Sequence, residues 1–187
     1  DVFWRNILDR HSAIIEVPQD RWDWRLFYEE KESGKDSALS KWGGFFPEIA
    51  FDPRRYGIPP KVMPHIGVPQ LLSLEVARRA LIDAGYEGGE FDRENTSVIV
   101  GSADGGGLLG DSLIARAHLN LIEPDSEAWD RLPEWTEDAF AGVLTNISAG
   151  RVANRFDLGG TNVTLDAACA SGLMSVDMAV SELVDGT

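Results

Sequence analysis

The stretch that decides the fold covers residues 161–184 and reads TNVTLDAACASGLMSVDMAVSELV. In residues 161–167, which run from Thr161 to Ala167, apolar and polar side chains alternate, as a pleated strand requires. Further on, the apolar residues recur at helical spacing, and this stripe consists of Leu173, Val176, Val180, Leu183 and Val184. The change of period predicts a strand that is followed at once by a helix.

A run of small residues, Ala-Cys-Ala-Ser-Gly at positions 168–172, joins the predicted strand to the predicted helix. Small side chains allow a sharp reversal and leave the central side chain at the tip, presented outward. That residue is Cys169, the single cysteine of the chain. Unpaired N–H groups at a helix start favour a thiolate and can donate to a developing oxyanion, so Cys169 is the candidate nucleophile. An inert buried cysteine is the alternative that this spacing leaves open.

Composition narrows the classes of function. The chain has 187 residues, which suits one domain, and its 17 basic against 31 acidic residues give a net charge of −14. Without a basic cluster, a nucleic-acid or anionic-membrane surface is not expected. One cysteine excludes an internal disulfide framework, and His11, His65 and His118 lack zinc-ligand spacing, so no metal site is expected. No apolar run reaches the length of a membrane span, and the expected location is the cytoplasm.

The rest of the chain predicts alternating helices and strands. Apolar stripes predict helices over residues 70–84 and 108–123, and a continuous apolar run over residues 97–100 predicts a buried strand. Phe140, Val143, Leu144 and Ile147 are expected to form one helical stripe leading into the nucleophile strand. The glycine-rich residues 101–107 lack the lysine and spacing of a phosphate loop, so they predict a close backbone approach instead of nucleotide binding. Together these patterns predict an α/β domain with a largely parallel sheet.

Several motifs share a resemblance. The octet DAACASGL at residues 166–173 resembles the active-site cysteine motif of β-ketoacyl synthases, and residues 146–160 resemble the helix and turn that lead into it. The run GVPQL at residues 67–71 replaces the Asp-Pro-Gln-Gln-Arg run of common modular polyketide synthases. With residues 132–138, this departure resembles iterative multidomain synthases of the polyunsaturated fatty-acid and heterocyst-glycolipid kind.

The resemblance implies a thiolase-like fold, of which residues 1–187 match the amino-terminal half. Within it, residues 1–60 are expected to form a cap with loops, and residues 61–187 the core with the nucleophile turn. The family's first strand and its carboxyl-terminal half are expected to be absent from this chain.

The resemblance also implies a chemistry. In the family, the cysteine takes an acyl group from the phosphopantetheine of an acyl carrier protein, and decarboxylation of malonyl-carrier protein supplies the carbanion that condenses with it. Two histidines of the carboxyl-terminal half assist, and none of the three histidines here matches them. The resemblance therefore implies that Cys169 is catalytic, that no cofactor is bound directly, and that the chain alone is inactive. It further implies a homodimer formed through the strand from Thr161 to Ala167.

Two other functions stay open at this stage. A non-catalytic thiolase-fold partner, which would measure chain length or gate the carrier protein, fits the same fold. The presence of Cys169 argues against it, because such partners usually replace the cysteine. A cysteine peptidase is less well supported, because no histidine or asparagine context accompanies these motifs.

Overall fold

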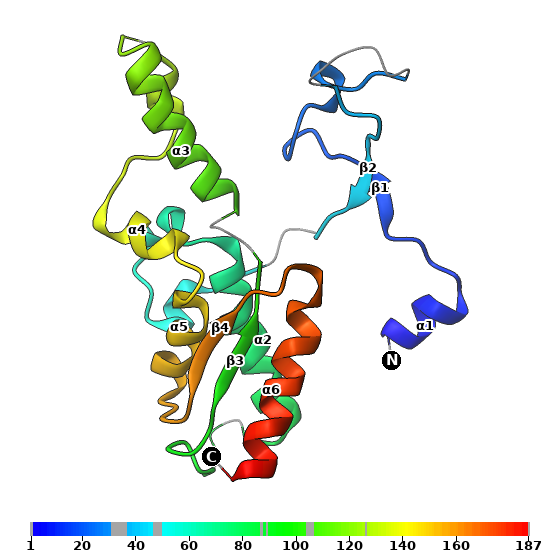
Figure 1. Cartoon of the computed structure of the whole chain (residues 1–187), viewed down its shortest axis with the longest axis vertical. Coiled ribbons are helices and arrows are strands. Elements are labelled where there is room, and N and C mark those ends of the chain that lie inside the picture. Colours follow the sequence, from blue (N-terminus) through cyan, green and yellow to red (C-terminus); the bar gives the residue numbers. More distant parts are fainter. Residues whose placement is uncertain are drawn as a thin grey trace. The chain divides into compact units, whose positions relative to one another are not determined.

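The structure is a computed structural model that describes residues 2–30, 37–46, 50–86, 88, 90–103, 107–125 and 127–186 (Figure 1). The chain divides into two compact units, Asp1–Ala50 and Phe51–Thr187.

The first unit contains a helix, α1 (Val2–Leu8), and a small antiparallel sheet. Its strands are β1 (Ile14–Glu16) and β2 (Trp42–Gly44), paired so that Ile15 lies opposite Gly43. A short 3₁₀ helix, η1 (Trp24–Leu26), lies between them in sequence. None of the residues of α1 is buried.

Aromatic side chains hold this unit together. The Trp22 ring stacks on Phe27 with 5.4 Å between ring centroids. The Lys41 ammonium lies 4.4 Å from the ring centroid of Trp24 and 3.1 Å from a carboxylate oxygen of Glu16. These contacts combine cation–π attraction with an ion pair, and they fit aromatic anchors that pin a long loop.

The second unit carries the longer helices and a parallel strand pair. In chain order its elements are η2 (Pro53–Tyr56), η3 (Pro60–His65), α2 (Val68–Asp83), β3 (Val98–Gly101), α3 (Gly107–Ile122), η4 (Glu127–Arg131), α4 (Glu137–Val143), α5 (Ile147–Phe156), β4 (Asn162–Leu165), η5 (Ala168–Ala170) and α6 (Ser171–Asp185). The helices that the sequence predicts over residues 70–84 and 108–123 correspond to α2 and α3. The predicted strands correspond to β3 and β4.

The two strands run parallel and in register from Val98 opposite Asn162 to Gly101 opposite Leu165. Both strands therefore end at the same edge of the sheet, where the chain turns into η5 and α6 (Figure 1). Helices α5 and α6 each contact both strands and lie on opposite sides of them, and α2 packs against α5. A helix–sheet–helix arrangement results, and it agrees with the predicted α/β class.

The core lies on the α2 and α5 side of the sheet. Its buried members come from η2, the segments around η3, α2, β3 and α5, and they are Tyr56, Ile58, Ile66, Leu74, Val98, Ala149, Val152 and Ala153. Tyr56 and Ile58, which the sequence-based division assigns to the cap segment, thus belong to the core cluster.

Helix α6 presents the opposite situation. Its one buried residue is Ser171, whereas its apolar stripe is exposed to solvent. Leu173 is 80% exposed and Leu183 is 84% exposed. Val176, Val180 and Val184 are exposed as well. The predicted stripe is therefore present on the helix, but the described part of this chain does not cover it.

The single helical stripe predicted over residues 140–147 is wrong. Helix α4 ends at Val143 and α5 begins at Ile147, and Leu144 between them has an extended backbone with φ −81° and ψ 123°. The carbonyl oxygens of Leu144 and of two residues of α4 accept hydrogen bonds from the side-chain amide of Gln70 instead of continuing a helix. Tertiary hydrogen bonding thus interrupts the helical pattern.

In the ranges that the structure describes, no helix is both long enough and apolar enough to cross a membrane.

Candidate active site

Cys169 lies on a sharp turn between strand and helix. β4 ends at Leu165, the 3₁₀ turn η5 contains the cysteine as its middle residue, and α6 begins at Ser171. Cys169 is a free thiol and is exposed. The predicted strand, small-residue turn and helix are therefore confirmed, and Cys169 is exposed rather than buried among the described residues.

The turn contains a strained backbone. Ala168 has φ +48°, in the left-handed region that residues with a Cβ rarely adopt. Its N–H donates to Oδ1 of Asp166 at 2.8 Å, and its carbonyl oxygen accepts from the Ser171 hydroxyl at 2.7 Å. The same hydroxyl accepts from the N–H of Ala167 at 2.9 Å. Side chains on both sides of the turn thus hold the residue that precedes Cys169.

A close approach of β3 fixes the start of α6. Gly101, the last residue of β3, leaves so little space that an added Cβ would lie 2.4 Å from the carbonyl oxygen of Ser171. Only glycine permits this separation. The sequence predicts a close backbone approach within residues 101–107, and Gly101 makes one to the start of α6, directly after the turn that contains Cys169. Residues 104–106 lie outside the described residues.

The three histidines lie in different segments of the chain. His11 lies in the first unit, and His118 is exposed on α3. His65 ends η3, and its Nδ1 is buried with no hydrogen-bond partner among the described residues. The described part of the chain shows no hydrogen bond or ion pair from any of them to Cys169, so they gain no role here. In the same ranges, no cluster of three or more His, Cys, Asp or Glu side chains could hold a metal ion.

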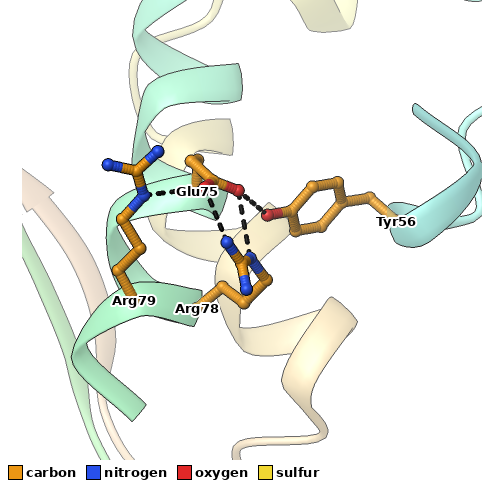
Figure 2. A network of polar contacts seen from close by, with 4 residues as sticks. All are labelled: Tyr56, Glu75, Arg78 and Arg79. Carbon is orange, nitrogen blue, oxygen red and sulfur yellow. Dashed lines mark hydrogen bonds and ion pairs between the residues drawn. The ribbon is translucent and has the colours of Figure 1, made fainter. Parts of the chain in front are cut away.

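A separate polar network lies on α2 (Figure 2). Oε2 of Glu75 accepts from the Tyr56 hydroxyl at 2.5 Å, and Oε1 accepts from Arg78 at 2.7 Å and from Arg79 at 2.8 Å. The hydrogen bonds from Arg78 and from Tyr56 hold the pKa of Glu75 far below its usual range. Burial, reinforced by the carboxylate, raises the pKa of Tyr56. The network joins η2 to α2 and is structural.

Gln70 forms a second buried anchor. Its Nε2 donates to the carbonyl oxygens of Ala141 (2.9 Å), Gly142 (3.0 Å) and Leu144 (3.2 Å). Its Oε1 accepts from Nε of Arg151 at 2.9 Å, and burial lowers the pKa of that guanidinium. Because Gln70 and these partners are far apart in sequence, no local pattern predicts the network.

Sequence reasoning missed the part that Ser171 takes in the turn. In the sequence, this residue stands out only by its small size. The available signal was a serine two residues after the candidate nucleophile, at the position where the helix begins.

Comparison with known proteins places the chain in a family. The family model described as "Beta-ketoacyl synthase, N-terminal domain" matches residues 1–187, and the chain belongs to this family.

Relatives of the chain are large synthases. The chain is 31% identical to a polyunsaturated fatty acid synthase polypeptide of Thraustochytrium sp., over 98% of this chain and 7% of that protein. It is 29% identical to polyketide synthase PksN of Bacillus subtilis, over the whole of this chain and 3% of that protein. The chain therefore spans only a small part of these relatives, which are a polyunsaturated fatty acid synthase and a polyketide synthase.

Solved structures agree on the fold. A ketosynthase domain of oxazolomycin synthesis from Streptomyces albus superposes with a TM-score of 0.70 at 27% identity, over 98% of this chain and 29% of that one. The ketosynthase from module 6 of the Bacillus subtilis bacillaene synthase gives 0.71 at 21% identity, over 98% of this chain and 26% of that one, and supports the fold alone. The thiolase-like fold, of which this chain matches the N-terminal part, is thereby confirmed.

Proposed function

We propose that this chain is the nucleophile-bearing part of a β-ketoacyl-acyl-carrier-protein synthase domain, and that Cys169 carries the acyl group during condensation. The observation that carries the proposal is the exposed thiol at the tip of a strained strand-to-helix turn. Such a turn presents a nucleophile at the carboxyl edge of a sheet, where substrates of α/β proteins approach.

The proposed reaction has two stages. The Cys169 thiolate attacks the carbonyl of an acyl thioester on a carrier protein, the C–S bond to phosphopantetheine breaks, and the leaving thiolate takes a proton from solvent. Malonyl-carrier protein then loses CO₂, and the resulting enolate attacks the acyl-cysteine carbonyl. A C–C bond forms, the bond to Sγ breaks, and the thiolate is regenerated. Covalent capture divides one difficult condensation into two easier steps.

The backbone at the turn suits this chemistry. Among the residues that the structure describes, the N–H of Cys169 has no hydrogen-bond acceptor. It can donate to the oxygen that becomes negative when the thioester carbonyl is attacked, as one arm of an oxyanion hole.

The carboxyl-terminal half of the domain is the proposed partner of α6. The exposed apolar stripe of this helix, which includes Leu173 and Leu183, is a surface that a soluble monomer rarely leaves open. A second half packed on it would also bring the two histidines of the family to Cys169. This chain alone is therefore expected to be inactive in condensation.

The second proposed partner is another copy of the domain. Among the described residues, β4 pairs only with β3, so its outer edge carries backbone groups without a neighbouring strand. Antiparallel pairing of two such edges, over the strand from Thr161 to Ala167, would remove this hazard. An active full-length protein that sediments as a monomer would contradict the proposed dimer.

The decisive experiment follows the acyl group. The full-length protein and its Cys169→Ala variant are incubated with an acyl-carrier-protein thioester, and acyl adducts are located by peptide mass spectrometry. We expect an adduct on Cys169 and loss of both adduct and condensation in the variant. Undiminished elongation by Cys169→Ala would overturn the proposal. An adduct without condensation would favour a non-catalytic thiolase-fold partner instead.

A cytoplasmic location is also proposed, because the single cysteine suits a reducing compartment. Cell fractionation checks it.

A further inference from the structure

The Ser171 hydroxyl makes two hydrogen bonds that close the turn around Cys169. It accepts from the N–H of Ala167, two residues before the cysteine, and donates to the carbonyl oxygen of Ala168, the residue directly before it. Ser171 is only 5% exposed although Cys169 itself is exposed. A single buried hydroxyl therefore ties the first residue of α6 to the backbone on the far side of the nucleophile.

Ser175, one turn later on the same helix, shows that this arrangement is specific. Its hydroxyl donates to the carbonyl oxygen of Gly172 at 2.8 Å, the same spacing of three residues that joins Ser171 to Ala168. Back-bonding of this kind is ordinary for serine in a helix. Acceptance of an N–H from before the turn distinguishes Ser171 from it.

The two bonds act on the strained residue. Ala168 has a Cβ and φ +48°, a conformation that persists only when its surroundings hold it. Asp166 holds its N–H and Ser171 holds its carbonyl oxygen. The backbone N–H of Ser171 donates to the same carbonyl oxygen, so loss of the hydroxyl would remove one of its two donors and the acceptor of the Ala167 N–H. The hold on Ala168 would weaken, and because Cys169 follows directly, relaxation of φ would move the Sγ from its position.

The close approach of Gly101 fixes the backbone of Ser171, which carries the hydroxyl. A Cβ there would lie 2.4 Å from the Ser171 carbonyl oxygen, so β3 and the start of α6 are in direct backbone contact. The position of Ser171 is thus set by the sheet, and the position of Ala168 is set by Ser171.

We propose that Ser171 is a positioning residue for Cys169: its hydroxyl holds Ala168 in the left-handed conformation and thereby aims the thiol. The inference rests on the proposed function, since a positioned thiol matters only if Cys169 reacts. It adds a residue that touches neither substrate nor the reacting atoms and acts through the backbone.

The test measures the reactivity of the thiol itself, independently of condensation. Full-length protein is treated with iodoacetamide across a range of pH, and the rate of Cys169 alkylation is read from peptide mass spectrometry. Ser171→Ala removes both bonds, Ser171→Thr keeps the hydroxyl, and Ser175→Ala is the matched control. We expect Ser171→Ala to react about ten-fold more slowly with an altered pH profile, since two hydrogen bonds are lost. We expect Ser171→Thr to stay within about three-fold of the parent, because its hydroxyl can make the same bonds.

Gly101→Ala is the second route to the same outcome. Its Cβ must displace the start of α6, so it should slow alkylation even though it leaves both hydroxyl and thiol in the sequence. Ser171→Ala should also speed hydrogen exchange at the Ala167 amide, whereas Ser175→Ala should not.

Each other result overturns the proposal. A parent-like rate and pH profile in Ser171→Ala or in Gly101→Ala would show that the thiol is not aimed by this contact. A Ser171→Thr variant as slow as Ser171→Ala would exclude the hydroxyl as the cause. Loss of the cooperative unfolding transition in Ser171→Ala would assign the hydroxyl to folding. Failure of the proposed function would be a different result: elongation that continues undiminished in Cys169→Ala. The alkylation rates do not depend on that result.

Discussion

The two helices that flank the β3–β4 sheet differ in how much of their apolar surface the chain itself covers. On α5, Ala149 is fully buried and Val152 is 3% exposed, packed against α2 and the sheet. On α6, which contacts the same two strands, Leu173 and Leu183 are largely exposed. Among the described residues, the apolar face of α5 is therefore covered by α2 and the sheet, whereas the apolar stripe of α6 is left exposed.

The largest expected effect comes from a charge placed in the core between α5 and the sheet. Val152→Asp places an unpaired carboxylate in the core, and we expect a loss of about 4 kcal/mol or more in the free energy of unfolding. Urea unfolding of the full-length protein followed by tryptophan fluorescence measures it. Asn154→Asp, exposed on the same helix, is the control and should change little. A Val152→Asp variant as stable as this control would contradict the assignment of Val152 to a closed core.

The matching substitution on α6 tests whether another part of the domain covers its apolar stripe. Val180→Asp, on the exposed stripe, should cost about 3 kcal/mol in the full-length protein if another part of the domain covers this face. Protection of the α6 amides from hydrogen exchange should fall with it. Ser181→Asp, exposed beside it, is the control. An unchanged unfolding free energy in Val180→Asp would mean that the stripe stays open to solvent.

A smaller effect is expected from a substitution in the Glu75 network, which joins α2 to η2. Glu75→Gln removes a charged acceptor from Tyr56, Arg78 and Arg79 and should cost about 2 kcal/mol near neutral pH. The carboxyl has a folded-state pKa below its ordinary value of 4.5, so its contribution is full above that value and is lost as pH falls through the folded pKa. Urea midpoints of the parent and the variant should therefore converge as the pH is lowered below about 5. A difference that grows on acidification would contradict this assignment.

The smallest effect is expected at Ser175. In the part of the chain that the structure describes, its hydroxyl bonds only to the carbonyl of Gly172, so Ser175→Ala should change the unfolding free energy by less than about 0.5 kcal/mol. Thermal unfolding of the full-length protein provides the measurement. A larger loss would indicate that this hydroxyl has a partner outside the described residues.

Local patterns predict the parts of the fold that local physics determines. The period of α2 and the continuous apolar run of β3 are sufficient to place both elements. The small residues at positions 168–172 predict an exposed Cys169, because a sharp reversal needs little side-chain volume. These features depend on spacing within a few residues.

Long-range contacts account for what the sequence does not predict. The break between α4 and α5 arises from Gln70, which lies far upstream and takes carbonyl oxygens that a continuous helix would use. The exposure of α6 depends on which surface covers it, and periodicity identifies an apolar stripe without identifying its partner. The role of Ser171 requires the position of the Ala167 amide across the turn.

Position 70 requires a side chain that both donates and accepts hydrogen bonds, as the Gln70 amide does. Glutamate has the same shape, but its carboxylate cannot donate, so Gln70→Glu would set a negative charge against the oxygens of Ala141, Gly142 and Leu144. A mutation of one functional group, or deamidation as the protein ages, would turn attraction into repulsion at the junction of three helices.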